Sequence, residues 1–283
     1  MTTLVESPRR RRRRSGRTAA VCAALLGLIV LVTILAPLVA PYDPLSGDLT
    51  RVLEGPSAAH PFGTDELGRD VLSRVLHGGR GALAITAVAS VLTAFIALLL
   101  ALTASTLGPA VDAFVSRLGD VVLAVPTIVI AIVLLSFAGN SPAILITVMV
   151  LGGWVATFRL VRSTARTTLS LQYVAAARVA GVRPARIAWR HVVPAVAPIL
   201  VVSATAAASV VLISLSSLNY LGLGLQPPTP DWGQMVAAGQ SKLGTAPWLS
   251  LLPGCALALT VFCLHMVGDA LADRFGGHEE VSR

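Results

Sequence analysis

The chain has 283 residues, of which 55% are hydrophobic and only 13% are charged, and its mean hydropathy is +0.78. A soluble protein of this length would need far more polar surface, so this composition excludes an ordinary soluble domain. The apolar stretches are about 20 residues or longer and do not alternate, which excludes a transmembrane β-barrel. We therefore expect an all-α integral membrane protein.

The formal net charge of +8 would suit a nucleic-acid-binding protein, but its distribution argues against that class. Seven arginines precede the first apolar run, and seven more follow the fourth, between Arg159 and Arg190. Basic clusters that flank apolar runs are signals of membrane topology and of contact with lipid headgroups. No nucleic-acid partner is expected.

Hydropathy predicts six transmembrane helices, at about 19–40, 82–107, 113–138, 142–161, 193–218 and 248–272. The expected organisation is a basic tail (1–18), a first span with an outer segment (19–81), a transmembrane core (82–272) and a short tail (273–283). The positive-inside rule places both arginine clusters in the cytoplasm, and therefore both termini as well. The protein is then multi-pass, with its long segments 41–81 and 219–247 outside.

The outer segment contains His60–Asp70, with the sequence HPFGTDELGRD. Thr64 is in a position to cap a helix whose first turn would hold Asp65 and Glu66. A metal site is the alternative, built from the acids of this segment with His60 and His77. The spacing fits no standard ligand pattern, so we expect no metal.

The third and sixth predicted spans contain ionisable residues near their ends. Arg117 and Asp120 stand one turn apart and could pair, and Pro126 predicts a kink in the third span. In the sixth span His265, Asp269 and Asp273 share one helix face. That face favours either polar contacts between helices or a proton relay.

The segment 173–198, YVAAARVAGVRPARIAWRHVVPAVAP, lies between the fourth and fifth spans and contains no acid. Its small residues would let another protein approach the helix backbone closely, and Gly181 permits a sharp turn between two short helices. Because no phosphate-binding loop is present, and Lys242 is the only lysine, the chain cannot bind ATP by that motif. The segment is therefore interpreted as a docking element for a partner that supplies energy.

The chain resembles the permease subunits of ABC importers of the dipeptide, oligopeptide and nickel type over nearly everything after the first span. The motifs that support this resemblance are the third-span sequence LGDVVLAVP, the stretch LGLGLQPPTPDW at 221–232, and an outer signature. The signature residues are Gly63, Thr64, Asp65, Gly68, Arg69 and Asp70. The resemblance implies a type I ABC importer permease fold.

The docking element is similar to the cytoplasmic coupling loop of that family, expected at about 163–192. Ala175 stands where the family has a glutamate, while Ala176, Ala177, Gly181 and Pro194 match its pattern. The coupling residues implied are Ala175, Ala176, Ala177, Arg178, Gly181, Ile187, His191 and Pro194.

The family resemblance implies a permease that moves di- or oligopeptides, nickel or a similar small solute. Its implied partners are a second permease subunit forming a heterodimer, two ATPase subunits and an extracytoplasmic binding protein. The chain itself would be no enzyme and would hold no cofactor, because ATP and Mg²⁺ act on the ATPases. The alternative is a secondary ion-coupled transporter, for which only His265 offers a deep ionisable group.

Overall fold

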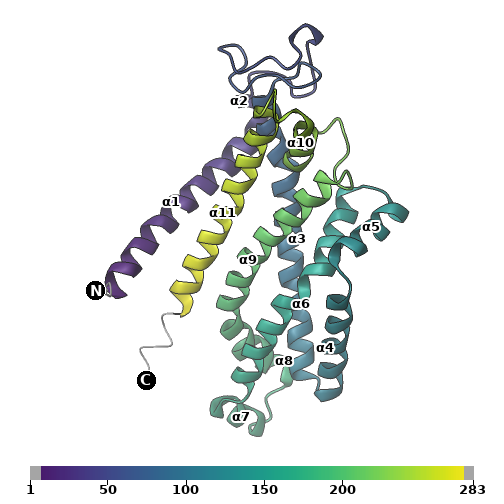
Figure 1. Cartoon of the computed structure of the whole chain (residues 1–283). Coiled ribbons are helices and arrows are strands. Elements are labelled where there is room, and N and C mark those ends of the chain that lie inside the picture. The colour runs from purple at the N-terminus through teal and green to yellow at the C-terminus, as the bar shows by residue number, and fades with distance from the viewer. Residues whose placement is uncertain (1–7, 277–283) are drawn as a thin grey trace, which may run out of the picture. The chain divides into compact units, whose positions relative to one another are not determined.

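The structure, a computed structural model, describes residues 8–276 (Figure 1). Over this range the chain forms helices joined by loops and contains no β-strand, only isolated β-bridges in the segment 47–70. The expected all-α class is confirmed. The end of the tail expected at 273–283 lies outside the described residues, as do the first seven residues of the basic tail.

Within the described range five helical stretches are long and apolar enough to cross a membrane, and a sixth span results if one bent pair is counted as a single crossing. The six predicted spans correspond to these elements. They are α1 (Pro8–Ile34), α3 (Val71–Thr106), the bent pair α4 (Pro109–Ala124) and α5 (Thr127–Ala138), α6 (Pro142–Leu169), α9 (Val193–Tyr220) and α11 (Trp248–Gly276).

The predicted kink at Pro126 is confirmed, and it is large: α4 and α5 meet at an angle of 83°. Val125 is extended (φ −104°, ψ 121°), as expected for a residue that precedes proline. Two glycines with positive φ, Gly108 before α4 and Gly139 after α5, mark the outer ends of the pair.

The chain divides into two compact units, 1–83 with 219–283, and 84–218. In the first unit α1 packs along α11, and α10 (Trp232–Gly239) packs on α11 as well (Figure 1). Short elements complete it: α2 (Ala36–Val39) and the 3₁₀ turns η1 (Leu49–Arg51) and η3 (Gln240–Lys242). Its core contains Val71, Val75, Trp232, Met235, Ala246 and Leu249.

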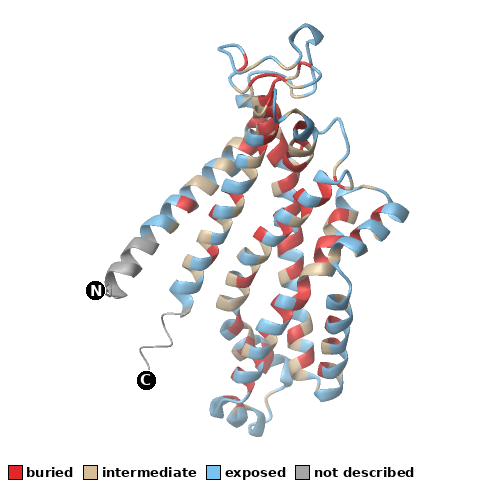
Figure 2. Cartoon of the chain, in the orientation of Figure 1, coloured by how far each residue is buried: buried red, intermediate tan, exposed pale blue. Residues whose placement is uncertain are grey.

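The second unit contains the rest of α3, the α4–α5 pair, α6 and most of α9. Between α6 and α9 lie α7 (Gln172–Val179), α8 (Pro184–Ile187) and a π-helical segment, η2 (Ala188–Val192). Its core runs along one face of α6, from Trp154 to Leu169. Many residues on the outward faces of the spans are exposed (Figure 2), which suits helices that contact lipid or another subunit.

Candidate functional site

The docking element begins with a short helix and a glycine turn. The amide N–H of Gly181 donates to the carbonyl of Arg178 (3.0 Å), and that of Val182 donates to the carbonyl of Ala177 (3.1 Å). These two bonds define a Schellman motif, which requires a left-handed residue after the helix. Gly181 supplies it with φ +77°. The predicted turn between two short helices is confirmed.

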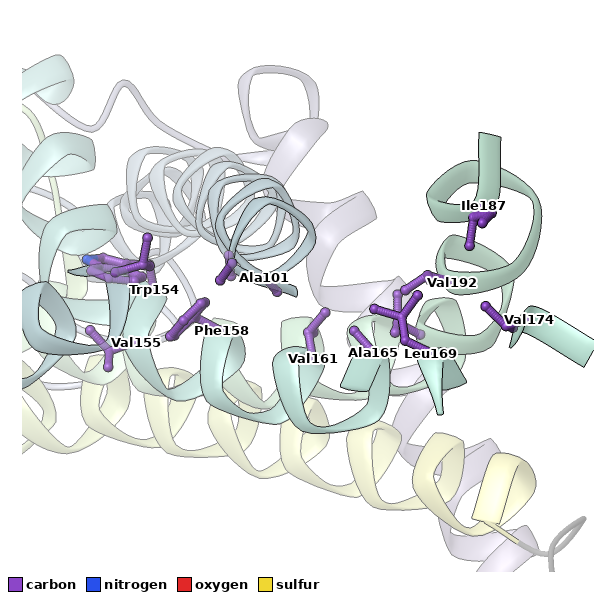
Figure 3. Packing of buried hydrophobic residues seen from close by; sticks show 14 residues of the cluster. Ala101, Trp154, Val155, Phe158, Val161, Ala165, Leu169, Val174, Ile187 and Val192 are labelled. Carbon is purple, nitrogen blue, oxygen red and sulfur yellow. The ribbon is translucent and has the colours of Figure 1, made fainter. Parts of the chain in front are cut away.

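Hydrophobic side chains fix the docking element to the end of α6. Val174, Ile187 and Val192 are at most 2% exposed. They belong to the same cluster as Ala165 and Leu169 of α6 (Figure 3). Ile187, which the family resemblance placed among the coupling residues, is therefore an anchor of the element and does not lie on its surface. This packing joins the element directly to α6.

The other residues for which the family resemblance implies a coupling role are exposed or half-buried on the element. A Cβ placed on Gly181 would meet no atom within 4 Å, so open space surrounds the turn. The imidazole of His191 lies against the Tyr173 ring in a tilted arrangement, with 5.4 Å between centroids and 56° between the ring planes. Ala177 and His191 are half-buried, while the exposed residues of this set are Ala175, Ala176, Arg178, Gly181 and Pro194.

Two large apolar side chains accompany these small residues at the surface. Val179 is 91% exposed and Trp189 is 68% exposed. Exposed apolar groups of this size, set among arginines, are typical of a surface that another protein or the lipid interface covers. Sequence patterns had marked only the small and basic residues. Exposure identifies these two apolar ones.

Ion pairs between α4 and α6 use part of the arginine cluster. Arg162 and Arg166 both donate to the carboxylate of Asp112, and Arg162 Nη2 lies 2.5 Å from Asp112 Oδ2. Asp120 pairs with Arg159 at 2.6 Å. The expected pairing of Asp120 with Arg117 is therefore wrong, because a guanidinium on the neighbouring helix reaches the carboxylate instead.

The outer signature does not start a helix, so the expected cap at Thr64 is wrong. Residues 63–70 form a loop, in which Gly63 and Gly68 have positive φ. The Thr64 hydroxyl donates to the carbonyl of Arg51 and accepts from the amide of Glu54. Helix α3 begins only at Val71, after this loop.

The charged residues of the signature hold the loop together. Asp65 accepts from the backbone and Nε of Arg69 (3.0 and 2.7 Å). Asp70 accepts from the amide and hydroxyl of Ser73, so Asp70 satisfies donors in the first turn of α3. Gly68 packs so closely that an added Cβ would lie 1.9 Å from the carbonyl oxygen of Asp48. Each signature residue thus has a structural role in the loop.

The histidines of this region are engaged in hydrogen bonds. Arg51 Nη1 lies 3.3 Å from His60 Nε2, and a guanidinium can only donate, so Nε2 accepts. His60 Nδ1 then donates to Asp70 Oδ1 at 3.0 Å. His77 Nδ1 faces the carbonyl of Ser73. Across residues 8–276 no group of three or more His, Cys, Asp or Glu could hold a metal ion.

Asp231 is a buried acid that the sequence patterns did not identify. Its Oδ1 accepts from the amides of Gly233 and Gln234 and so caps α10, while its Oδ2 has no hydrogen-bond partner. Burial raises the pKa of this carboxyl to about 6, although the hydrogen bonds from the Gln234 and Gly233 amides act in the opposite direction. The cap of α10 is thus a carboxyl whose ionised form is disfavoured by burial.

The second unit contains a pocket of about 150 Å³ among α5, α6 and α9. Thr127, Ser214 and Ser217 contribute hydroxyls, and the other lining side chains are apolar. No charged residue lines it. Such a pocket suits a neutral hydrogen-bonding group rather than a bare ion.

Two family descriptions match the chain. Residues 93–277 match the binding-protein-dependent transport system inner membrane component, and residues 9–56 match the N-terminal transmembrane domain of oligopeptide transport permease C. The chain belongs to this family of ABC importer permeases, and the expected family resemblance is confirmed.

Several relatives are similar along most of their length. A di/tripeptide transport system permease protein of Pseudomonas aeruginosa is 36% identical over 87% of this chain and 83% of its own. A dipeptide transport system permease protein of Alkalihalophilus pseudofirmus is 33% identical over 88% and 84%. A glutathione transport system permease protein of Pectobacterium atrosepticum is 34% identical over 93% and 88%.

Proposed function

We propose that the chain is one transmembrane subunit of an ATP-driven importer of short peptides, which an extracytoplasmic binding protein delivers. The observation that carries this proposal is the docking element: small exposed residues and a glycine turn, anchored by Ile187 and Val192 to the core of α6. A partner that presses on this surface would move α6 with it. Such a coupling between contact and span rearrangement is what alternating access requires.

The partners follow from the family and from the chemistry that the chain lacks. Two ATPase subunits would bind ATP and Mg²⁺ and dock on the element, so the permease would itself be no enzyme and hold no cofactor. A second permease would complete a heterodimer. Both termini and the coupling loop at about 163–192 would be cytoplasmic in this arrangement, in accordance with the positive-inside rule.

Peptides are the proposed cargo, because the relatives described above are named for di- and tripeptides, dipeptides and glutathione. Glutathione is itself a tripeptide, so these names share one substrate class. They favour peptides over nickel. The uncharged pocket in the second unit offers the hydroxyls of Thr127, Ser214 and Ser217, which could hydrogen-bond to the amide groups of a peptide that crosses the membrane.

The docking assignment is tested by co-purification of the ATPases with variants of the element. Gly181→Val strains a residue with φ +77°, and Ala177→Trp places a large side chain on the small-residue surface. Both should lose the ATPases and peptide uptake while the permease still inserts. Matched controls are Gly139→Val, at another open position with φ +80°, and Ala138→Trp on the exposed end of α5.

The controls should retain the ATPases. Stable complexes with both docking variants would contradict the assignment. Uptake by the permease alone, abolished by an ionophore and indifferent to ATP, would instead favour the ion-coupled transporter.

A further inference from the structure

A pocket of about 290 Å³ lies in the first unit, between the outer signature, the Pro227–Pro228 loop and α10. We call it the outer pocket. Its volume is close to the lower limit of pockets that bind small molecules. Val71, Met235 and Leu249 are buried side chains that give it an apolar lining. Four charged residues also line it: Asp65, Glu66, Arg69 and Arg74.

The two arginines of the outer pocket share one carboxylate. Asp65 Oδ2 lies 2.7 Å from Arg69 Nε and 3.4 Å from Arg74 Nε. Arg74 also donates to the carbonyl of Pro44, which is neutral. The side chain of Arg74 is only 7% exposed. One positive charge therefore has no matching carboxylate among the described ion pairs, and a ligand carboxylate would compensate it well in this shielded position.

Glu66 gives the same pocket a carboxylate that is open to a cation. Its only described ion pair is with Lys242 Nζ, at 3.9 Å, and its side chain is 51% exposed. A contact of that length between exposed groups contributes little to stability. Glu66 is thus available to an ammonium group without loss of a strong native interaction.

We propose that the outer pocket binds a short peptide in its zwitterionic form. The peptide carboxylate contacts Arg69 and Arg74, the terminal ammonium contacts Glu66, and a side chain packs on Met235 and Leu249. The choice of a peptide among zwitterions rests on the proposed function. The site itself rests on the charges and volume of the pocket. It would give the permease its own contact with substrate, separate from that of the binding protein.

The test measures equilibrium binding of radiolabelled Ala-Phe to the full-length protein in lipid nanodiscs. The free peptide should bind saturably. Ala-Phe amide, which lacks the carboxylate, and N-acetyl-Ala-Phe, which lacks the ammonium, should each bind about tenfold more weakly, the size of one lost charge-assisted contact. Equal affinity for all three ligands would overturn the proposal.

Three variants distinguish binding in this pocket from binding elsewhere: two test the pocket volume and one tests the ammonium contact. Ala238→Trp fills the pocket from an exposed position on α10 and should abolish binding, while Ser241→Trp, exposed but outside the lining, should not. Glu66→Gln should weaken free Ala-Phe about tenfold and leave the N-acetyl peptide unchanged, because only the ammonium contact is lost. Unchanged binding by Ala238→Trp would refute the site.

The pocket could instead receive a side chain of the binding protein. In that case the nanodisc protein would bind no free peptide, and the proposal would fail. The result is independent of the docking test. If the wild-type protein binds the peptide but does not co-purify with ATPases, this inference stands and the proposed function fails. If it co-purifies with ATPases but binds no peptide, only this inference fails.

Discussion

Asp231 is a buried carboxyl at the start of α10 whose ionisation is disfavoured by its surroundings. Its carboxylate caps α10 through Gly233 and Gln234, yet one oxygen has no partner. Because the folded pKa is about 6 and the ordinary pKa of an aspartate is 3.8, the folded protein binds a proton more tightly than the unfolded chain. Ionisation of Asp231 then costs stability as pH rises from about 4 through 6, and the full cost is present above that range.

We predict that Asp231→Asn flattens the dependence of stability on pH. The amide oxygen keeps the cap, while the ionisation is removed. In the wild type the shift corresponds to a loss of about 1.4 kcal/mol between pH 5 and pH 7.5, out of roughly 3 kcal/mol in total. Thermal unfolding of the purified protein at both pH values measures this difference.

Asp48→Asn provides the control for that measurement. Hydrogen bonds from the Thr50 side chain and backbone hold the pKa of the exposed Asp48 below its usual range, so it does not titrate between pH 5 and pH 7.5. This control should keep the slope of the wild type. A variant Asp231→Asn with that same slope would show that the carboxyl is not coupled to folding.

Three ion pairs between α4 and α6 involve two aspartates, Asp112 and Asp120, whose side chains differ in exposure. The side chain of Asp112 is 9% exposed and accepts from two arginines, whereas that of Asp120 is 60% exposed and accepts from one. Removing one partner of a shielded pair leaves the other charge uncompensated, while an exposed pair contributes little.

Asp112→Asn should therefore destabilise the protein by about 1–3 kcal/mol, and Asp120→Asn by less than about 1 kcal/mol. The two variants carry the same substitution on the same helix, since both aspartates lie on α4 and pair with arginines of α6. They therefore differ mainly in the exposure of the carboxylate. Denaturant or thermal unfolding in the same detergent compares them. Equal losses would mean that shielding at Asp112 is unimportant.

At the scale of the elements, the sequence predicted where helices exist better than where they end. Each span that hydropathy predicted falls on a long helix or on the bent α4–α5 pair, and Pro126 located the break, because both signals are local. The start of α3 was missed, since Asp70 stabilises it from a loop that depends on Gly63 and Gly68. That loop depends on contacts with residues 47–54, which no short-range pattern reveals.

The site was predictable to the extent that it depends on local chain geometry. The Schellman turn at Gly181 followed from a glycine after a run of helix formers. The burial of Ile187 and the pairing of Asp120 with Arg159 did not follow, because each depends on a neighbouring helix. Asp231 escaped notice for the same reason: only burial makes its pKa unusual.

At the scale of the whole molecule, sidedness is the prediction that most needs a direct measurement. We expect Arg183→Cys in the docking element to react with a membrane-impermeant maleimide only after the cytoplasmic side is opened. Ser241→Cys in the segment 219–247 should react in intact cells. Both variants require a background in which Cys22, Cys255 and Cys263 are replaced by alanine.

Both positions can report on sidedness, because Arg183 and Ser241 are exposed in the structure. The reverse pattern of labelling would place the docking element on the outside. No ATPase could then reach it, and the positive-inside assignment of both termini would fail with it.

The ion pairs of α4 with α6 also determine how the arginine-rich region presents itself to another protein. Arg159, Arg162 and Arg166 form ion pairs within the molecule, although Arg162 and Arg166 share the single carboxylate of Asp112. No described carboxylate forms an ion pair with the other four, which are Arg178, Arg183, Arg186 and Arg190. An acidic surface is the natural complement of these four guanidinium groups. Its attachment should weaken as ionic strength rises, because dissolved salt screens attraction between exposed charges.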